Sequence, residues 1–140
     1  MLLSRKGVLA IAAVIDVALH SRNRPVSAKA LAGRHGLPPR HLEPVLQALV
    51  HQGILRGVRG PRGGYELGRE QRQISAEEIL RAADTVADKT DPQFPGTALV
   101  RTVVLPALAQ AERAFAAALS DLRLDGLVRR AESTRKLEAG

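Results

Sequence analysis

A glycine-rich segment at residues 56–65, Arg-Gly-Val-Arg-Gly-Pro-Arg-Gly-Gly-Tyr, constrains the fold of this chain more than any other feature. Glycine and proline favour a tight reversal of the backbone, and the apolar residues Ile54, Leu55 and Leu67 on either side suit short strands. We therefore expect a β-hairpin over residues 54–67. No acidic residue stands among its three arginines, so the loop is predicted to meet phosphate.

The excess positive charge lies in the half of the chain that holds this hairpin. Residues 1–70 contain 11 Lys and Arg against 4 Asp and Glu, whereas residues 71–140 contain 10 of each class, and the formal net charge is +7. Such asymmetry indicates one half that binds a polyanion and a neutral half with another task.

Helical patterns on both sides of a glycine precede the hairpin. Gly36 follows a short apolar repeat and is suited to end a helix, because glycine tolerates the left-handed conformation there. The expected helices cover residues 4–19, 28–35 and about 37–52. Helix, short helix, tight turn, helix and hairpin is the order of a winged helix-turn-helix, so we expect a mostly α fold with a small β-hairpin wing.

Pro44 lies several residues inside the third expected helix. Proline has no N–H and removes a hydrogen bond to the carbonyl of Arg40. Either the helix begins nearer Arg40, or it kinks at Pro44.

The second half of the chain predicts a long amphipathic helix over residues 98–122. Only 2% of the residues are aromatic, so a single protomer has few large side chains to bury and a shared dimer core is favoured over a ligand pocket. Pro106 either kinks this helix or lies in its first turn. Apolar residues at steps of three and four form the expected dimer interface, namely Val104, Leu108, Ala111, Phe115, Ala118 and Leu122.

The remaining segments complete the expected organisation. Ser75-Ala76-Glu77-Glu78 is a capping-box pattern and predicts a helix over residues 76–83. Residues 84–97 are polar and rich in proline and glycine, which is typical of a linker or mobile loop. A shorter helical tail is expected over residues 124–137.

The exposed side of the third helix carries the residues that we expect to read DNA bases. Arg40, His41, Glu43 and Gln47 lie opposite the apolar side of that helix. Arginine suits guanine O6 and N7, and a glutamate can accept from cytosine N4. Glu43 is either a specificity device or a partner that holds Arg40 in place.

Two further groups are expected to contact DNA. Arg59 and Arg62 at the wing tip are predicted to enter a minor groove. Helix starts favour phosphate because their N–H groups are free. With the rest of the wing, the candidates are Ser4, Arg5, Lys6, Ser27, Lys29, Arg56, Arg59, Gly60, Arg62 and Gly63.

Four segments of the chain resemble the IscR/NsrR-type bacterial regulators, the group named after Rrf2. They are Ser-Arg-Lys-Gly at 4–7, Gly-Leu-Pro-Pro-Arg-His-Leu-Glu at 36–43, Gly-Ile-Leu at 53–55 and Arg-Gly-Pro-Arg-Gly-Gly-Tyr-Glu-Leu at 59–67. The resemblance implies a homodimeric, sequence-specific transcription regulator, usually a repressor, that binds a pseudo-palindromic operator in double-stranded DNA and dimerises through its long C-terminal helix. The expected parts are a DNA-binding domain at 1–83, a sensing loop at 84–97, and a dimerisation helix with its tail at 98–140.

The chain departs from this family at the cofactor. Iron–sulfur sensors of the family carry three cysteines in the region that is here residues 92–106, and this chain has no cysteine. We therefore expect no cofactor, and a signal read by other chemistry, through an unknown small-molecule or protein effector.

Other functional classes are less favoured by the sequence. The main alternative is a winged-helix protein-interaction module that uses the basic wing on an acidic protein. An enzyme and a metal site are not expected, because the four histidines have no metal-ligand spacing and Asp16 with His20 is better explained as an ion pair on one helix face. The apolar stretch near the N-terminus is interrupted by Asp16, so a signal peptide is not expected, and the stretch is too short to span a bilayer. A basic protein without disulfides suits the cytoplasm, which is the expected location.

Overall fold

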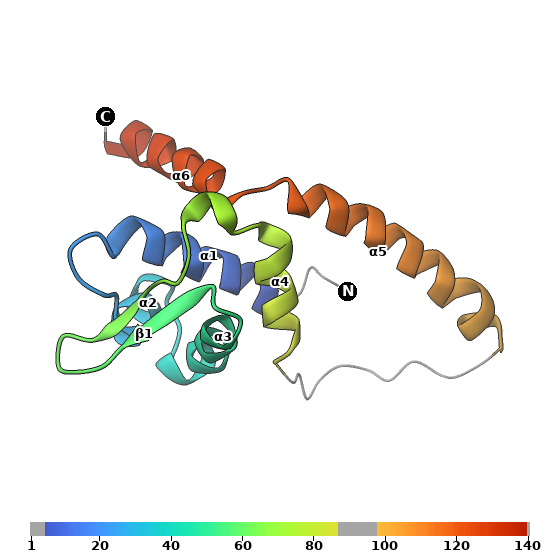
Figure 1. Cartoon of the computed structure of the whole chain (residues 1–140), viewed down its shortest axis with the longest axis horizontal. Helices are drawn as coiled ribbons and strands as arrows, with labels where there is room; N and C mark the ends of the chain where they lie inside the picture. The colour runs from blue at the N-terminus through green and yellow to red at the C-terminus, as the bar shows by residue number, and fades with distance from the viewer. Residues whose placement is uncertain (1–4, 87–97, 140) are drawn as a thin grey trace.

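The computed structural model describes residues 5–86 and 98–139, which form six α-helices, a two-stranded hairpin and two short helical turns (Figure 1). The mostly helical winged helix-turn-helix fold is confirmed. In chain order the elements are α1 (Arg5–His20), α2 (Ala28–Arg34), α3 (Pro39–His51), β1 (Leu55–Val58), β2 (Gly64–Leu67), η1 (Gln71–Gln73), α4 (Ala76–Asp84), η2 (Val100–Val104), α5 (Leu105–Ser120) and α6 (Leu124–Ala139).

Helices α1, α2 and α3 pack around one aliphatic core. Their inward faces carry small and branched side chains at helical spacing, and the largest of them are fully buried. Ser27 caps α2 as expected, because its Oγ accepts a hydrogen bond from the Ala30 N–H at 3.0 Å. Gly36 follows α2 with φ +64°, which confirms the left-handed turn between the two helices.

Helix α3 begins at Pro39, close to Arg40, and continues through Pro44. The side chain of Pro44 is exposed, so its ring displaces no core residue. The buried side of α3 consists of Leu42, Val45, Leu46 and Leu49. Because this apolar side is buried in the core, the opposite side of α3 faces outward.

The hairpin is joined to the helical core by a third, very short strand segment. Strands β1 and β2 pair antiparallel, with Leu55 opposite Leu67 and Val58 opposite Gly64. Val26, just before α2, forms a β-bridge with Tyr65, in which the two N–O distances are 2.9 and 2.8 Å. The wing is therefore anchored to the segment that precedes α2.

Helix α4 begins at the predicted capping box. The Ser75 Oγ accepts from the Glu78 N–H at 3.2 Å, and the Glu78 carboxylate accepts from the Ser75 N–H at 3.1 Å. Both orphan N–H groups are satisfied at a position where Ser75 is almost fully buried. The turn η1 just before it was not predicted.

The predicted helix over residues 98–122 is present as a continuous helical segment over residues 98–120, but part of it is π-helical. A π-helical turn, η2, precedes α5, and Pro106 lies in the first turn of α5. The reason is the missing N–H of Pro106, which cannot donate to the carbonyl four residues earlier and which widens the turn. Pro106 therefore lies in the first turn of the α-helical part, directly after the π-helical turn and not at the start of the whole helical segment.

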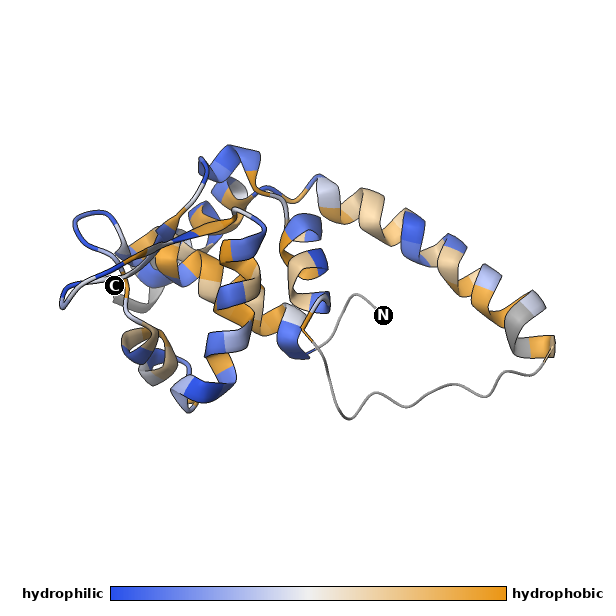
Figure 2. Ribbon diagram, turned by 60° about the horizontal axis from the view of Figure 1, so that its bottom comes forward, coloured by the Kyte–Doolittle hydropathy of each residue, from blue (hydrophilic) through white to orange (hydrophobic). Residues whose placement is uncertain are grey.

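Helix α5 extends away from the body of the molecule, whereas α6 returns to it (Figure 1). Leu119, near its C-terminal end, is the buried residue of α5 and packs on Ala76 and Leu80 of α4. The predicted helical tail is a full helix, α6, whose Leu124 and Val128 enter the main core. Figure 2 shows apolar residues along the projecting α5, outside that core.

Candidate nucleic-acid interface

The outward side of α3 presents the four predicted base-reading residues. Arg40, His41, Glu43 and Gln47 are all exposed. Within the described residues no ion pair joins Glu43 to Arg40, so the structure does not support the role of Glu43 as a partner that holds Arg40. The surface therefore offers cationic, acidic and amide groups side by side.

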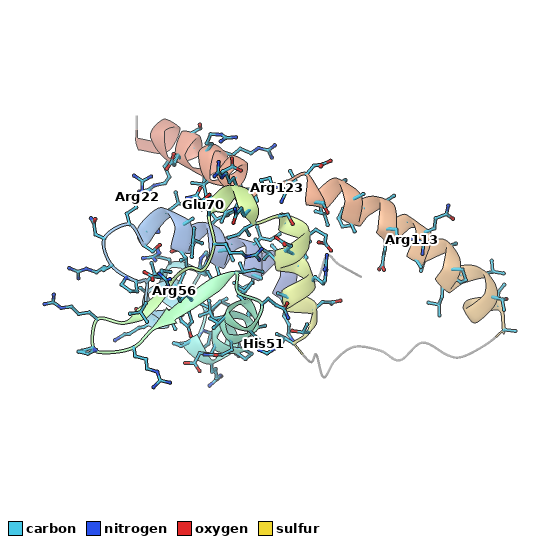
Figure 3. All side chains as sticks on the ribbon, in the orientation of Figure 1. Arg22, His51, Arg56, Glu70, Arg113 and Arg123 are labelled. Atoms are coloured by element: carbon cyan, nitrogen blue, oxygen red, sulfur yellow. The ribbon has the colours of Figure 1, made fainter. Side chains whose placement is uncertain are left out.

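The wing carries two arginines that are free to bind an anion. Arg59 and Arg62 are exposed, and in the part of the chain that the structure describes no carboxylate lies within ion-pair distance of either. Arg56 differs, because Glu66 lies directly opposite it across the hairpin. The Arg56 Nε donates to the Glu66 Oε1 at 2.8 Å, and Figure 3 shows Arg56 on this strand. The sequence interpretation, which considered only the residues between the arginines, missed this pairing.

Gly60 and Gly63 shape the wing turn, which contains Arg62 and directly follows Arg59. Gly60 has φ +112°, which side-chain-bearing residues rarely adopt. A Cβ on Gly63 would lie 2.1 Å from the carbonyl oxygen of Val58. The Gly63 N–H donates to the Gly60 carbonyl at 2.9 Å, so these glycines hold a tight turn with Arg62 inside it and Arg59 just before it.

Tyr65 connects the wing to α3, a role that the sequence interpretation did not assign. Its hydroxyl lies 3.4 Å from the Gln47 Nε2, while its backbone pairs with Val26. A groove of about 350 Å³ lies between α3 and the wing, and Arg59 lines it together with Gln47 and Tyr65. Arg59 is therefore on the α3 side of the wing.

The helix starts differ in what they offer. Ser4 lies outside the described residues. Arg5 and Lys29 are exposed, Lys6 is half-buried, and Ser27 caps α2. Arg5 and Lys29 are thus the accessible cations of this group.

A buried carboxylate fixes α1 to α2 behind the wing. Asp16 accepts from Arg34 in a two-pronged contact, with Nη2–Oδ1 at 2.6 Å and Nε–Oδ2 at 2.9 Å. Its Oδ1 lies 3.1 Å from the His20 Nδ1, which confirms the predicted contact, and its Oδ2 lies 3.3 Å from the His35 Nε2. Burial opposes the charge, but Arg34, with smaller contributions from the two histidines, holds the pKa of Asp16 below its ordinary value. Sequence spacing could not reveal Arg34, because it lies on another helix.

The predicted dimer residues fall into two groups. Val104, Leu108 and Phe115 are 39%, 55% and 38% exposed, and Ala111 and Ala118 are also exposed. Leu122 is half-buried against Ala76, Leu80 and Leu119 of its own chain. Three further exposed apolar residues, which the sequence interpretation did not select, extend the surface to Leu99, Val103 and Leu105.

The described residues bear on two other expectations. No three His, Asp or Glu side chains within 5–86 and 98–139 gather as a metal site would require, and no helix there is both long and apolar enough to cross a bilayer. Most of the predicted sensing loop at 84–97 lies outside the described residues. The division into 1–83 and 98–140 stays a prediction, although α6 shares the core of α1.

Comparison with known protein families identifies similar sequences. The sequence model of the Rrf2 family, described as "Iron-dependent Transcriptional regulator", matches residues 3–130. The HTH-type transcriptional regulator IscR of Xenorhabdus nematophila is 40% identical over 90 residues, which cover 64% of this chain and 55% of that protein. IscR of Cronobacter sakazakii is 38% identical over 96 residues, covering 69% and 59%. The chain thus spans less than two thirds of the length of these curated relatives.

Solved structures share the fold. T. potens IscR superposes with a TM-score of 0.72 at 29% identity, covering 94% of this chain and 89% of that one. CymR of B. subtilis, a global cysteine regulator, gives a TM-score of 0.67 at 23% identity, covering 91% and 96%, and this likeness concerns the fold alone.

Proposed function

The chain belongs to the Rrf2 family of transcriptional regulators, and on this premise we propose that it is a homodimeric, sequence-specific DNA-binding repressor without an iron–sulfur cluster. The observation that carries the DNA-binding part is Arg59, an exposed wing arginine that pairs with no carboxylate of the described residues and lines the groove beside the exposed polar side of α3. Arg62, which also pairs with no carboxylate there, lies on the same wing turn. Guanidinium groups on a projecting hairpin suit a minor groove, and a polar helix face suits a major groove.

Dimerisation is supported by the exposed apolar side of α5. Monomeric proteins rarely leave a long row of large aliphatic and aromatic side chains in water. A second copy of α5 would bury Leu108 and Phe115 and would set the distance between two α3 helices. Two recognition helices about 34 Å apart suit a pseudo-palindromic operator, and occupation of such a site within a promoter represses transcription.

The donor set supports function without an iron–sulfur cluster. The 140 residues contain no thiolate to hold iron, and among the described residues no three His, Asp or Glu side chains are arranged to hold a metal ion. The residues do not fit the cluster, so the regulatory signal reaches this protein by another route, which we place in residues 84–97.

The test of DNA binding compares two arginines of the same hairpin. DNA fragments retained by the protein from a genomic pool would be sequenced, and one enriched fragment would be titrated. We expect Arg59→Ala to weaken binding by about 1–3 kcal/mol, the usual range for a good contact. Arg56→Ala is the matched control and should weaken binding less, because Glu66 already neutralises Arg56.

The salt dependence of the same titration separates the two functional classes. A protein that neutralises several phosphates loses affinity steeply as salt rises. A flat salt dependence, or retention of no sequence-selective fragment, would contradict the proposal and favour a protein-interaction module. Equal effects of the two variants on an enriched fragment would contradict the role of Arg59.

A further inference from the structure

A second basic hollow lies on the other side of the wing from α3. It has a volume of about 460 Å³ and is walled by the α1–α2 connection, the start of α2 and the wing turn. Arg62 lines this hollow, whereas Arg59 lines the groove beside α3. The two wing arginines therefore face different recesses.

Three arginines line the hollow, and they come from three separate parts of the chain. Arg24 comes from the α1–α2 connection, Arg34 from α2 and Arg62 from the wing. Arg24 and Arg62 are exposed, and no carboxylate of the described residues pairs with either. Because like charges repel, an anion bound among these arginines would be stabilised by their combined positive charge.

Arg34 is held in place for such a contact. Its Nε and Nη2 donate to Asp16, which lies buried behind it, and its Nη1 makes no hydrogen bond to the described residues. The Ser27 hydroxyl accepts from the Ala30 N–H and keeps its own hydrogen available. The wall of the hollow thus combines two free guanidinium groups, one oriented guanidinium donor and one hydroxyl donor.

We propose that this hollow binds a phosphate group. Guanidinium groups match phosphate oxygens in geometry and remain charged, and three of them exceed the single negative charge of Asp16. The phosphate belongs either to the DNA backbone, in which case the inference rests on the proposed function, or to a free phosphate compound. If the phosphate belongs to DNA, the wing turn contacts the DNA on two sides: Arg59 enters a DNA groove, and Arg62 contacts the sugar-phosphate backbone.

Arg24 provides the test, because it lines the hollow and lies outside the α3 face and the wing. Arg22→Ala is the matched control, since Arg22 is in the same connection but pairs with Glu132 on α6 (Figure 3). Each lost phosphate contact lowers the slope of log affinity against log salt by about 0.9. If the ligand is DNA, Arg24→Ala should lower this slope on a mixed-sequence duplex and Arg22→Ala should leave it unchanged.

A second measurement detects a free phosphate ligand without any DNA. The melting temperature would be compared in sodium phosphate and in sodium chloride at equal ionic strength. If the ligand is a free phosphate compound, sodium phosphate should raise the melting temperature of the wild type more than that of Arg24→Ala. Arg22→Ala should behave like the wild type.

The two measurements together decide the inference. If the wild type binds no DNA, the proposed function fails and the phosphate measurement alone decides the pocket. If Arg24→Ala matches Arg22→Ala in both measurements, the phosphate pocket is overturned even where DNA binding itself is intact. Far-ultraviolet circular dichroism of each variant confirms that the exposed substitutions leave the fold unchanged.

Discussion

At the scale of single residues, the most consequential side chain outside the DNA-facing surface is Asp16. It is 7% exposed and charged, which proteins tolerate only when the charge is well paired. Arg34 provides that pairing from α2, and His20 and His35 lie at the two oxygens. One carboxylate thereby fixes the position of α2, the helix that precedes α3.

Asp16→Asn should lower the free energy of unfolding at neutral pH by about 3 kcal/mol, near the lower end for a broken buried pair because Arg34 is partly exposed. The folded-state pKa of Asp16 lies below its ordinary value, so its charge stabilises the fold at neutral pH. That contribution is lost as the pH falls through the folded pKa, below about pH 4.

Urea unfolding of the wild type and of Asp16→Asn across this pH range measures the effect. The difference between the two proteins should shrink as the solution becomes more acidic. A difference that stays constant down to the acid limit would show that Asp16 acts through its shape and not through its charge.

At the scale of elements, the sequence predicted those whose signal is local. The spacing of Leu42, Val45, Leu46 and Leu49 was enough to place the buried and exposed sides of α3. The hairpin followed from glycine and proline chemistry, and α4 followed from its capping box. These features depend on residues within a few positions of one another.

Features that depend on distant residues were not predictable in this way. Arg24, Arg34 and Arg62 reach one hollow only because Val26 pairs with Tyr65 and brings the wing against the start of α2. The π-helical turn before Pro106 could not be predicted, because it depends on how the surrounding backbone adjusts to the N–H group that proline lacks. The pairing of Arg56 with Glu66 required the register of the hairpin.

Breaking the capping box of α4 should lower the free energy of unfolding measurably. Ser75→Ala removes the acceptor for the Glu78 N–H in a buried position, and we expect a loss of about 1 kcal/mol in the free energy of unfolding. Glu78→Gln is the comparison, because glutamine can still accept from the Ser75 N–H. Chemical denaturation of both variants should therefore rank Ser75→Ala as the less stable; the reverse order would show that the charge of Glu78 matters more than the cap.

At the scale of the whole molecule, a compact winged-helix body bears one projecting helix. The body contains the buried core and every basic recess described above. Helix α5 contributes little to that core, and its apolar side is exposed over most of its length (Figure 2). This arrangement places the binding surface and the proposed dimer surface in different parts of the chain.

Introducing a charge on α5 tests the proposed dimer. Leu108→Glu or Phe115→Glu should convert a dimer to a monomer in sedimentation experiments, because a carboxylate would be buried between the two copies. Arg113→Glu is the control, because it introduces a glutamate on the opposite side of the same helix, as the turn of 100° per residue shows (Figure 3). This variant should leave the dimer intact. Dimers that persist in both apolar-side variants would assign this surface to another partner.

Leu119 is the single buried residue of α5, so this helix can rotate as a rigid rod about the point where Leu119 packs on α4. Leu105 lies 14 residues from Leu119, which is about 21 Å at the rise of an α-helix. A rotation of about 10° at Leu119 would therefore move the far end by about 4 Å, about the axial length of one DNA base pair. In the proposed dimer, a change too small to disturb the core could thus shift the two winged-helix bodies relative to the two halves of the proposed operator.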